Sequence, residues 1–299
     1  MKKPTKILCA IAALTAFFSM GVVIGVWRAE RHAWPERPFL MLQQAIKKMP
    51  METDWDGRIV KYEGKQEVPC PPQDKNTAVI LAAGQSNSSN YAGQRYRAIN
   101  ENVINYFNGK CYLASSPLLG ADGNYGESWT LLGNKLVQAG LFKRVIIIST
   151  GIGGSRMQQW APGGKLNRLL LSVLADLKPR YSLTYFLWHQ GETDYQMHEK
   201  EDNYVRDFNG MVESVRGAGM HPKFFISLVS YRGNFQEWSE DNPLRRAQAR
   251  VVNGKDILAG PDTDLELGSL DRIDEIHFSG TGQEKFTNSY MNILKKNLD

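Results

Sequence analysis

The sequence predicts an α/β fold in which helices cover both faces of a parallel sheet. Five apolar runs have the length of buried strands, and segments with a single apolar helical face separate them. Strands that alternate with helices of this length imply right-handed crossovers, which place helices on both faces. We therefore expect a three-layer α/β/α sandwich, and 299 residues suffice for one such domain with a substantial core.

The chain begins with the pattern of a membrane anchor. Residues 7–27 carry no charged side chain and are about long enough to cross a bilayer as a helix. Three lysines in residues 1–6 predict a cytoplasmic N-terminal tail, with the rest of the chain on the other side, the periplasm in a Gram-negative cell. A cleaved signal peptide is the main alternative, although the run exceeds a usual h-region and no clear Ala-x-Ala site follows it. A buried soluble helix is disfavoured by the flanking lysines.

The positive charge of the chain belongs mainly to this N-terminal region. The net charge is +5, but residues 1–37 hold six basic side chains against two acidic ones, or +4. The remaining 262 residues therefore carry only +1. The body of the protein shows no basic excess that would favour nucleic acid as a partner.

Residues 28–74 are polar, interrupted by prolines and mixed in charge, with one short amphipathic helix expected at residues 39–48. We expect a stalk that connects the anchor to a catalytic domain at residues 75–299 and packs partly onto it. Cys70 and Cys111 fall in the exported part, where an oxidising compartment permits a disulfide. Two free thiols are the alternative, and the pair has no metal-ligand spacing.

The predicted strands occupy residues 78–83, 145–148, 183–188, 224–229 and 257–259. The predicted helices occupy residues 128–139, 166–177, 204–216, 243–252 and 282–295. No internal repeat or low-complexity tract interrupts this alternation.

The first strand ends abruptly in Gly84-Gln85-Ser86-Asn87. Open α/β sheets bind ligands at the carboxyl ends of their strands, so Ser86 is a candidate nucleophile at such a crevice. The alternative is structural, because glycine also forms turns and serine also caps helices.

Two later strands end in polar residues that would lie at the same edge. Gly153-Gly154-Ser155 follows the second strand, and paired glycines allow close approach of a ligand or simply a tight turn. Gln190-Gly191-Glu192 follows the third strand. The Gln190 amide suits an oxyanion, and Glu192 suits either a histidine partner or a helix N-terminus.

The C-terminal region contains Asp274 and His277, three residues apart. On one turn the carboxylate can accept the imidazole Nδ1–H, which leaves Nε2 free as a base. Without Ser86 a solvent-facing pair would explain this spacing.

Taken in order, these four motifs and Trp160 resemble the conserved blocks of the SGNH (GDSL-like) hydrolase superfamily. Within it they are most similar to the sialate O-acetylesterase and acetyl xylan esterase branch, carbohydrate esterase family six. The resemblance covers about residues 77–296. It implies a flavodoxin-like sheet of five parallel strands and a metal-free serine hydrolase that needs no cofactor.

The resemblance implies that Ser86 is the nucleophile, His277 the base and Asp274 its orienting acid, with Glu192 as the alternative acid. It implies an oxyanion hole formed by the Ser86 N–H, the Gly154 N–H and the Gln190 amide, with Gly153 replacing Gly154 if the register differs by one. Gln190 stands where the wider superfamily has Asn. Candidate substrate-binding residues are Gln85, Asn87, Arg156, Trp160 and Tyr195, although core packing explains the two aromatics equally well.

The expected function is a membrane-anchored serine esterase that removes O-acetyl groups from a glycan, such as a sialate, a xylan-like chain or an envelope polysaccharide. An O-acetyltransferase with the same triad is the alternative, and no residue distinguishes the two. A non-catalytic glycan-binding domain is a third hypothesis, which the intact set of motif residues disfavours.

Overall fold

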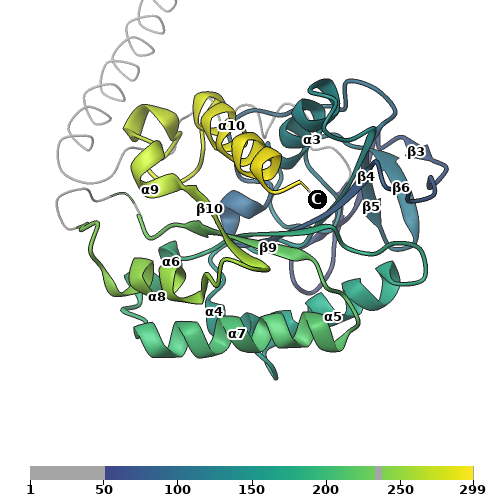
Figure 1. Ribbon diagram of the computed structural model, residues 1–299. Helices are drawn as coiled ribbons and strands as arrows, with labels where there is room; N and C mark the ends of the chain where they lie inside the picture. The colour runs from purple at the N-terminus through teal and green to yellow at the C-terminus, as the bar shows by residue number, and fades with distance from the viewer. Residues whose placement is uncertain (1–50, 232, 234–237, 299) are drawn as a thin grey trace, which may run out of the picture. The chain divides into compact units, whose positions relative to one another are not determined.

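The computed structural model describes residues 51–231, 233 and 238–298, and residues 51–299 form one compact unit (Figure 1). The predicted cytoplasmic tail, membrane anchor and amphipathic helix lie outside the described residues. Among the helices that the structure describes, none is long and apolar enough to cross a membrane.

A central, mostly parallel sheet organises this unit. All five predicted strands are present, as β4 (Thr77–Gly84), β7 (Arg144–Ser149), β8 (Tyr185–His189), β9 (Lys223–Leu228) and β10 (Ile257–Asp262). The strand order is β10-β9-β8-β4-β7-β5-β6-β3, so β4 lies in the interior of the sheet. Every residue of β4 is buried, because both faces of the strand are covered.

The sheet also contains a hairpin that the prediction of five strands missed. β5 (Val103–Phe107) runs parallel to β7 and then turns into the antiparallel β6 (Lys110–Leu113). The turn is Asn108-Gly109, and both residues have positive φ, +48° and +74°. Asn-Gly is the residue pair that such tight hairpins favour. Six strands are thus paired in parallel, and antiparallel pairing adds β6 and then β3 (Glu67–Val68) at one edge.

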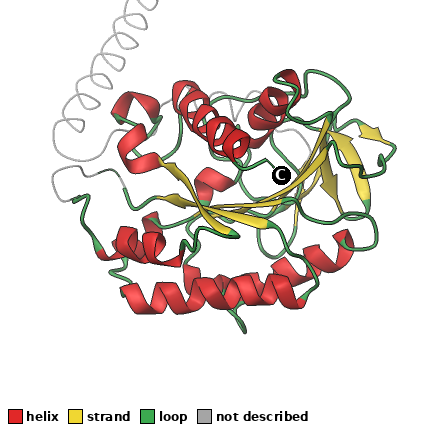
Figure 2. Ribbon diagram, viewed as in Figure 1, coloured by secondary structure: helices red, strands yellow, loops and turns green. Residues whose placement is uncertain are grey.

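Helices cover both faces of the sheet, as predicted (Figures 1 and 2). α3 (Trp129–Gln138) and α10 (Gly280–Lys296) contact each other on one face. The other face carries α5 (Lys165–Leu177), α7 (Glu201–Gly217) and α8 (Pro243–Val251). Alternate residues of β4 enter the two cores: Val79 and Leu81 belong to the cluster with α7, and Ile80 and Ala82 to that with α10.

Short elements at the ends of the strands complete the fold. They are η1 (Ser86–Ser88), α4 (Met157–Trp160), α6 (Glu192–Gln196), α9 (Thr263–Glu266) and η2 (Ser269–Asp271). A separate two-stranded sheet pairs β1 (Met51–Thr53) with β2 (Ile59–Tyr62).

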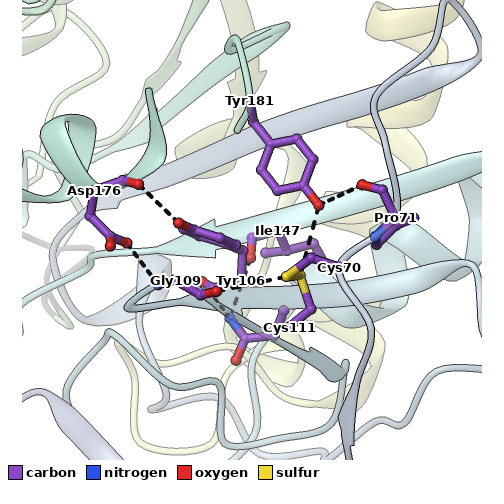
Figure 3. Close-up of a disulfide and its surroundings, with 9 residues drawn as sticks. Cys70, Pro71, Tyr106, Gly109, Cys111, Ile147, Asp176 and Tyr181 are labelled. Atoms are coloured by element: carbon purple, nitrogen blue, oxygen red, sulfur yellow. Dashed lines mark hydrogen bonds between the residues drawn. A yellow bond between two sulfur atoms is a disulfide. The ribbon is translucent and has the colours of Figure 1, made fainter. Parts of the chain in front are cut away.

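Residues 51–74, which the sequence assigns to a stalk, belong to the compact unit in the structure. Ile59 is fully buried, and its N–H and C=O bond to the backbone of Ala121 and Gly120 at 2.8 and 2.9 Å. Cys70 forms a disulfide with Cys111 of β6 (Figure 3). The segment therefore packs as part of the domain and is covalently fixed to the sheet at β6.

We expect loss of the disulfide to destabilise the domain. The bridge spans 41 residues, for which loop-closure entropy gives about 4 kcal/mol, with about 2–4 kcal/mol typical of measured cases. Replacement of both cysteines by serine should therefore lower Tm by roughly 5–10 °C in thermal unfolding. Reductant should lower the Tm of the wild type to the same value and leave the double variant unchanged. A wild-type Tm that does not respond to reductant would contradict the expectation.

Candidate active site

Ser86 stands at the carboxyl end of the central strand. β4 ends at Gly84, where φ is +134° and a side chain would collide with the carbonyl of His189, 2.0 Å from the Cβ position. Only glycine therefore allows β4 and β8 to approach here. The chain then turns into η1, and Ser86 is buried except for 6% of its surface. Its N–H has no hydrogen-bond partner among the described residues.

Asp274 and His277 form a hydrogen-bonded pair on one tight loop. Asp274 Oδ2 lies 2.6 Å from His277 Nδ1, and Asp274 Oδ1 accepts the backbone N–H groups of His277 and Ile276 at 2.8 and 3.2 Å. Burial acts to raise the pKa of Asp274, but these hydrogen bonds and the charge of His277 outweigh it and hold the pKa below its usual value. The carboxylate therefore stays ionised and directs Nε2 of His277 away from itself.

The Asn87 side chain holds this loop next to the segment that carries Ser86. Its Nδ2 donates to the carbonyl of Ile276 at 3.1 Å, and its Oδ1 accepts the N–H of Phe278 at 3.1 Å. These two bonds enclose His277, and Asn87 directly follows Ser86. Two segments that are 190 residues apart in sequence therefore meet at Asn87 and the loop that carries His277.

Glu192, the first residue of α6, lies next to Asn87 but does not pair with His277. The side chain is fully buried, and its Oε1 accepts Asn87 Nδ2 at 3.1 Å. Its other neighbour is His189, whose Nδ1 lies 4.0 Å from Oε1. Burial raises the pKa of Glu192 to about 6 and lowers that of His189 to about 3. Of the two candidate acids, Asp274 is the one in contact with His277.

The turn after β7 distinguishes the two glycines that were candidates for the oxyanion hole. The Gly153 N–H donates to Asp122 Oδ2 at 2.9 Å, so it is already engaged. Gly154 is exposed, adopts a φ of +66°, and its N–H has no hydrogen-bond partner among the described residues. The Ser86 and Gly154 N–H groups are thus the two free backbone donors from the predicted set.

Gln190 differs from its predicted role as the third oxyanion donor. Its side chain is fully buried, and Nε2 lies 2.5 Å from Asp194 Oδ2, 3.0 Å from the Ser155 carbonyl and 3.4 Å from Gln85 Oε1. Two N–H groups thus face three protein acceptors. In this arrangement the Gln190 amide joins loops together and offers no free donor to a ligand.

Three of the five candidate substrate-binding residues are buried instead of facing the crevice. Gln85 Oε1 accepts the N–H groups of Gly191 and Thr193, each at 3.3 Å, and Asn87 makes the contacts described above. Trp160 is fully buried and packs edge-on against Trp188, with ring centroids 5.3 Å apart, so core packing accounts for it.

The remaining two candidates, Arg156 and Tyr195, are partly exposed. Arg156 forms ion pairs with Asp194 and Glu199. Tyr195 packs partly against the core cluster.

The sequence reasoning missed residues that support the histidine loop. Arg272 is buried, stacks over the Tyr231 ring at 5.0 Å and donates to the Ile276 carbonyl at 2.7 Å. Tyr91 stacks on His277 itself, with ring centroids 5.3 Å apart. These residues belong to no motif, and no local pattern in the sequence identifies them.

Comparison with known families identifies a match over most of the chain. The family model described as "carbohydrate esterase, sialic acid-specific acetylesterase" matches residues 76–296, which include all four motifs. None of the curated protein sequences that were compared matches the chain.

Solved structures similar to this chain include a protein of Arabidopsis thaliana. That protein is 16% identical, the match covers 77% of this chain and all of the other, and the TM-score is 0.60. The psychrotrophic esterase EstA from Pseudoalteromonas sp. also matches, at 16% identity over 75% of this chain and 98% of its own, with a TM-score of 0.48. The carbohydrate acetylesterase XAC1771 from Xanthomonas citri matches at 16% identity over 72% of this chain and 56% of its own, with a TM-score of 0.47.

The buried Glu192 carboxyl should make the folding stability of the protein depend on pH. Its pKa is 4.5 in the unfolded chain and about 6 in the folded protein, so the folded state holds the proton more tightly. The contribution of Glu192 to the free energy of unfolding is therefore greatest below pH 4.5. It falls by about 2 kcal/mol as the pH rises from 4.5 through 6. Glu192→Gln keeps the acceptor for Asn87 and removes this loss.

The measurement is Tm from pH 4.5 to pH 8. Relative to the wild type, Glu192→Gln should gain stability between about pH 4.5 and pH 7, and the difference should then stay constant to pH 8. The exposed Glu63 provides the matched control, because Glu63→Gln should leave the difference constant. A Glu192→Gln profile parallel to that of the wild type would show that the buried carboxyl does not carry the effect.

Proposed function

The chain belongs to the carbohydrate esterase family of sialic acid-specific acetylesterases and is a carboxylic ester hydrolase, and from this premise we propose that it removes O-acetyl groups from a glycan through an acetyl-serine intermediate on Ser86. The observation that carries the proposal is the pairing of His277 Nδ1 with Asp274 Oδ2 at 2.6 Å, on a loop that is hydrogen-bonded to Asn87, the residue after Ser86. A nucleophile, a base and an orienting carboxylate are the three parts that such chemistry requires.

The proposed reaction has two halves. His277 Nε2 takes the proton of Ser86 Oγ as Oγ bonds to the acetyl carbonyl carbon. The negative charge that develops on the carbonyl oxygen is received by the N–H groups of Ser86 and Gly154. The bond to the sugar oxygen then breaks, and His277 donates its proton to that oxygen.

In the second half a water molecule replaces the sugar. His277 takes a proton from water as the water oxygen bonds to the acetyl carbon. The bond to Ser86 Oγ breaks, His277 returns its proton to the serine, and acetic acid leaves and loses its remaining acidic proton to solvent as acetate. Asp274 remains ionised throughout, because its role is to orient the imidazole and stabilise the imidazolium form.

The proposal also assigns the catalytic unit to an extracytoplasmic compartment, anchored by residues 7–27. Two observations support this assignment. The uncharged run follows three lysines, which is the pattern of an anchor with a cytoplasmic N-terminus. The Cys70–Cys111 disulfide is a bond typical of oxidising compartments and rare in the cytosol.

Kinetic variants test the triad. In the full-length protein, Ser86→Ala should reduce kcat on a chromogenic acetyl ester by at least about 10⁴-fold, and Asp274→Asn by about 10³- to 10⁴-fold. Glu192→Gln should stay within about tenfold of the wild type, because Glu192 reaches His277 only through Asn87. The reverse order for the two acids would assign the orienting role to Glu192, and an active Ser86→Ala would exclude the serine mechanism.

The substrate class is tested by acetate release from acetylated glycans. The full-length protein should release acetate from at least one of acetylated sialosides, acetylated xylan and acetylated envelope polysaccharide, and Ser86→Ala should release none. Activity on simple aryl acetates with none on any glycan would contradict the glycan assignment. Appearance of the acetyl group on an added oligosaccharide instead of as free acetate would indicate acetyl transfer.

Anchoring is tested by fractionation of cells that express the protein. The full-length chain should sediment with membranes and resist carbonate extraction, at the mass of all 299 residues. Deletion of residues 1–27 should release it into the soluble fraction. A soluble product of lower mass from the full-length gene would indicate a cleaved signal peptide instead.

A further inference from the structure

The Tyr91 ring occupies the space between the base and the glycine turn. It stacks on His277 with ring centroids 5.3 Å apart and planes 19° apart. A Cβ atom on Gly153 would come within 3.1–3.2 Å of the phenol carbons and oxygen, and one on Gly123 within 2.8 Å of a ring carbon. Glycine at both positions therefore leaves room for the ring, which touches the turn and the histidine at once.

Asp122 holds three segments of the site through one buried carboxylate. Its Oδ1 accepts the Ser89 hydroxyl at 2.6 Å, three residues after the nucleophile. Its Oδ2 accepts both the Tyr91 hydroxyl at 3.1 Å and the Gly153 N–H at 2.9 Å. The same carboxylate thus contacts the nucleophile segment, the oxyanion turn and the ring that stacks on the base.

We propose that Asp122 and Tyr91 are positioning residues that fix the His277 imidazole and the Gly153-Gly154 turn relative to one another. The inference rests on the proposed function, because it assigns the two residues to the same hydrolytic site. Neither residue needs to touch the substrate. Their effect is that the base and the oxyanion donor keep one geometry while Ser86 gains and loses the acetyl group.

The stacked ring also favours the charged form of the base. His277 becomes an imidazolium when it takes the Ser86 proton, and the face of an aromatic ring attracts a cation. The other charged groups reach His277 differently: Asp274 faces Nδ1, Arg272 bonds to the Ile276 carbonyl, and Glu192 acts through Asn87. Tyr91 alone among these described residues covers the imidazole face.

The experiment measures kcat and KM of the full-length protein on a chromogenic acetyl ester from pH 5 to pH 9. Tyr91→Leu should lower kcat about tenfold with KM within about twofold, because the imidazole loses the ring that holds its orientation. Tyr91→Phe keeps the ring and should therefore recover most of the kcat that Tyr91→Leu loses. Asp122→Asn should lower kcat about tenfold with KM within about twofold, because its amide nitrogen replaces an acceptor with a donor.

The double variant Tyr91→Leu/Asp122→Asn separates a shared role from two independent ones. Residues that act as one unit lose less together than the product of their single losses. The kcat of the double variant should therefore lie within about threefold of the kcat of the less active single variant. A loss equal to the product of the single losses would overturn the proposed pairing.

Matched controls exist beside the disulfide (Figure 3). Tyr106 donates its hydroxyl to the Asp176 carbonyl at 2.9 Å, and the Asp176 carboxylate accepts the Gly109 N–H at 3.1 Å. Tyr106→Phe and Asp176→Asn remove equivalent groups from another part of the domain and should leave kcat and the pH profile unchanged.

Two outcomes separate a failure of the positioning roles from a failure of the proposed function. If Ser86→Ala is inactive but the Tyr91 and Asp122 variants match the controls, the positioning inference fails and the proposed function stands. If Ser86→Ala stays active, the proposed function itself fails. Each kcat is referred to the concentration of active sites titrated with an organophosphonate, so a variant that is merely less stable keeps the kcat of the wild type.

Discussion

The geometry of the site depends on the buried amide of Asn87. The amide accepts the N–H of Phe278 and donates to the carbonyl of Ile276 and to Glu192. Aspartate would lack the donor and leucine would lack both functions, so an amide is the group of this size that fits. Because the side chain is 1% exposed, loss of these bonds would leave buried groups unpaired, at about 1–3 kcal/mol each. The contact that joins the segment after Ser86 to the loop of His277 is thus also one that holds the fold together.

Buried carboxylates position the other loops at the carboxyl ends of the strands. Asp122 binds the Gly153 N–H, Asp194 binds the Met157 N–H, and Asp264 binds the N–H groups of Ser230 and Tyr231. Burial raises the pKa of all three, although the hydrogen bonds oppose this. Arg156 and Arg245 pair with two of them. Irregular loops have no ladder of their own, and these charged acceptors satisfy the backbone groups that a sheet or helix would otherwise pair.

The strands and helices with strong periodicity were predictable from the sequence, and so were the four motifs at the strand ends. The β5–β6 hairpin was readable in Asn108-Gly109 but was missed, because β5 carries Asn105 at its centre and lacks a continuous apolar run. The contacts of Gln190 could not be predicted, because its motif indicates only that an amide stands at the crevice. The buried Asp194 four residues later then takes that amide. Tyr91 and Asp122 lie 186 and 155 residues before His277, and only the folded chain brings them together.

The disulfide gives the domain a particular response to force. A pull applied to the chain before residue 51 first reaches β1, β2 and β3 and then arrives at Cys70. There the load divides, because the bond to Cys111 leads into β6 at the edge of the sheet. Residues 71–76 carry the rest to β4, the strand that ends in the Gly84-Gln85-Ser86 turn. The covalent link therefore shares the load on the N-terminal segment, so that only part of the tension reaches the strand that carries the serine.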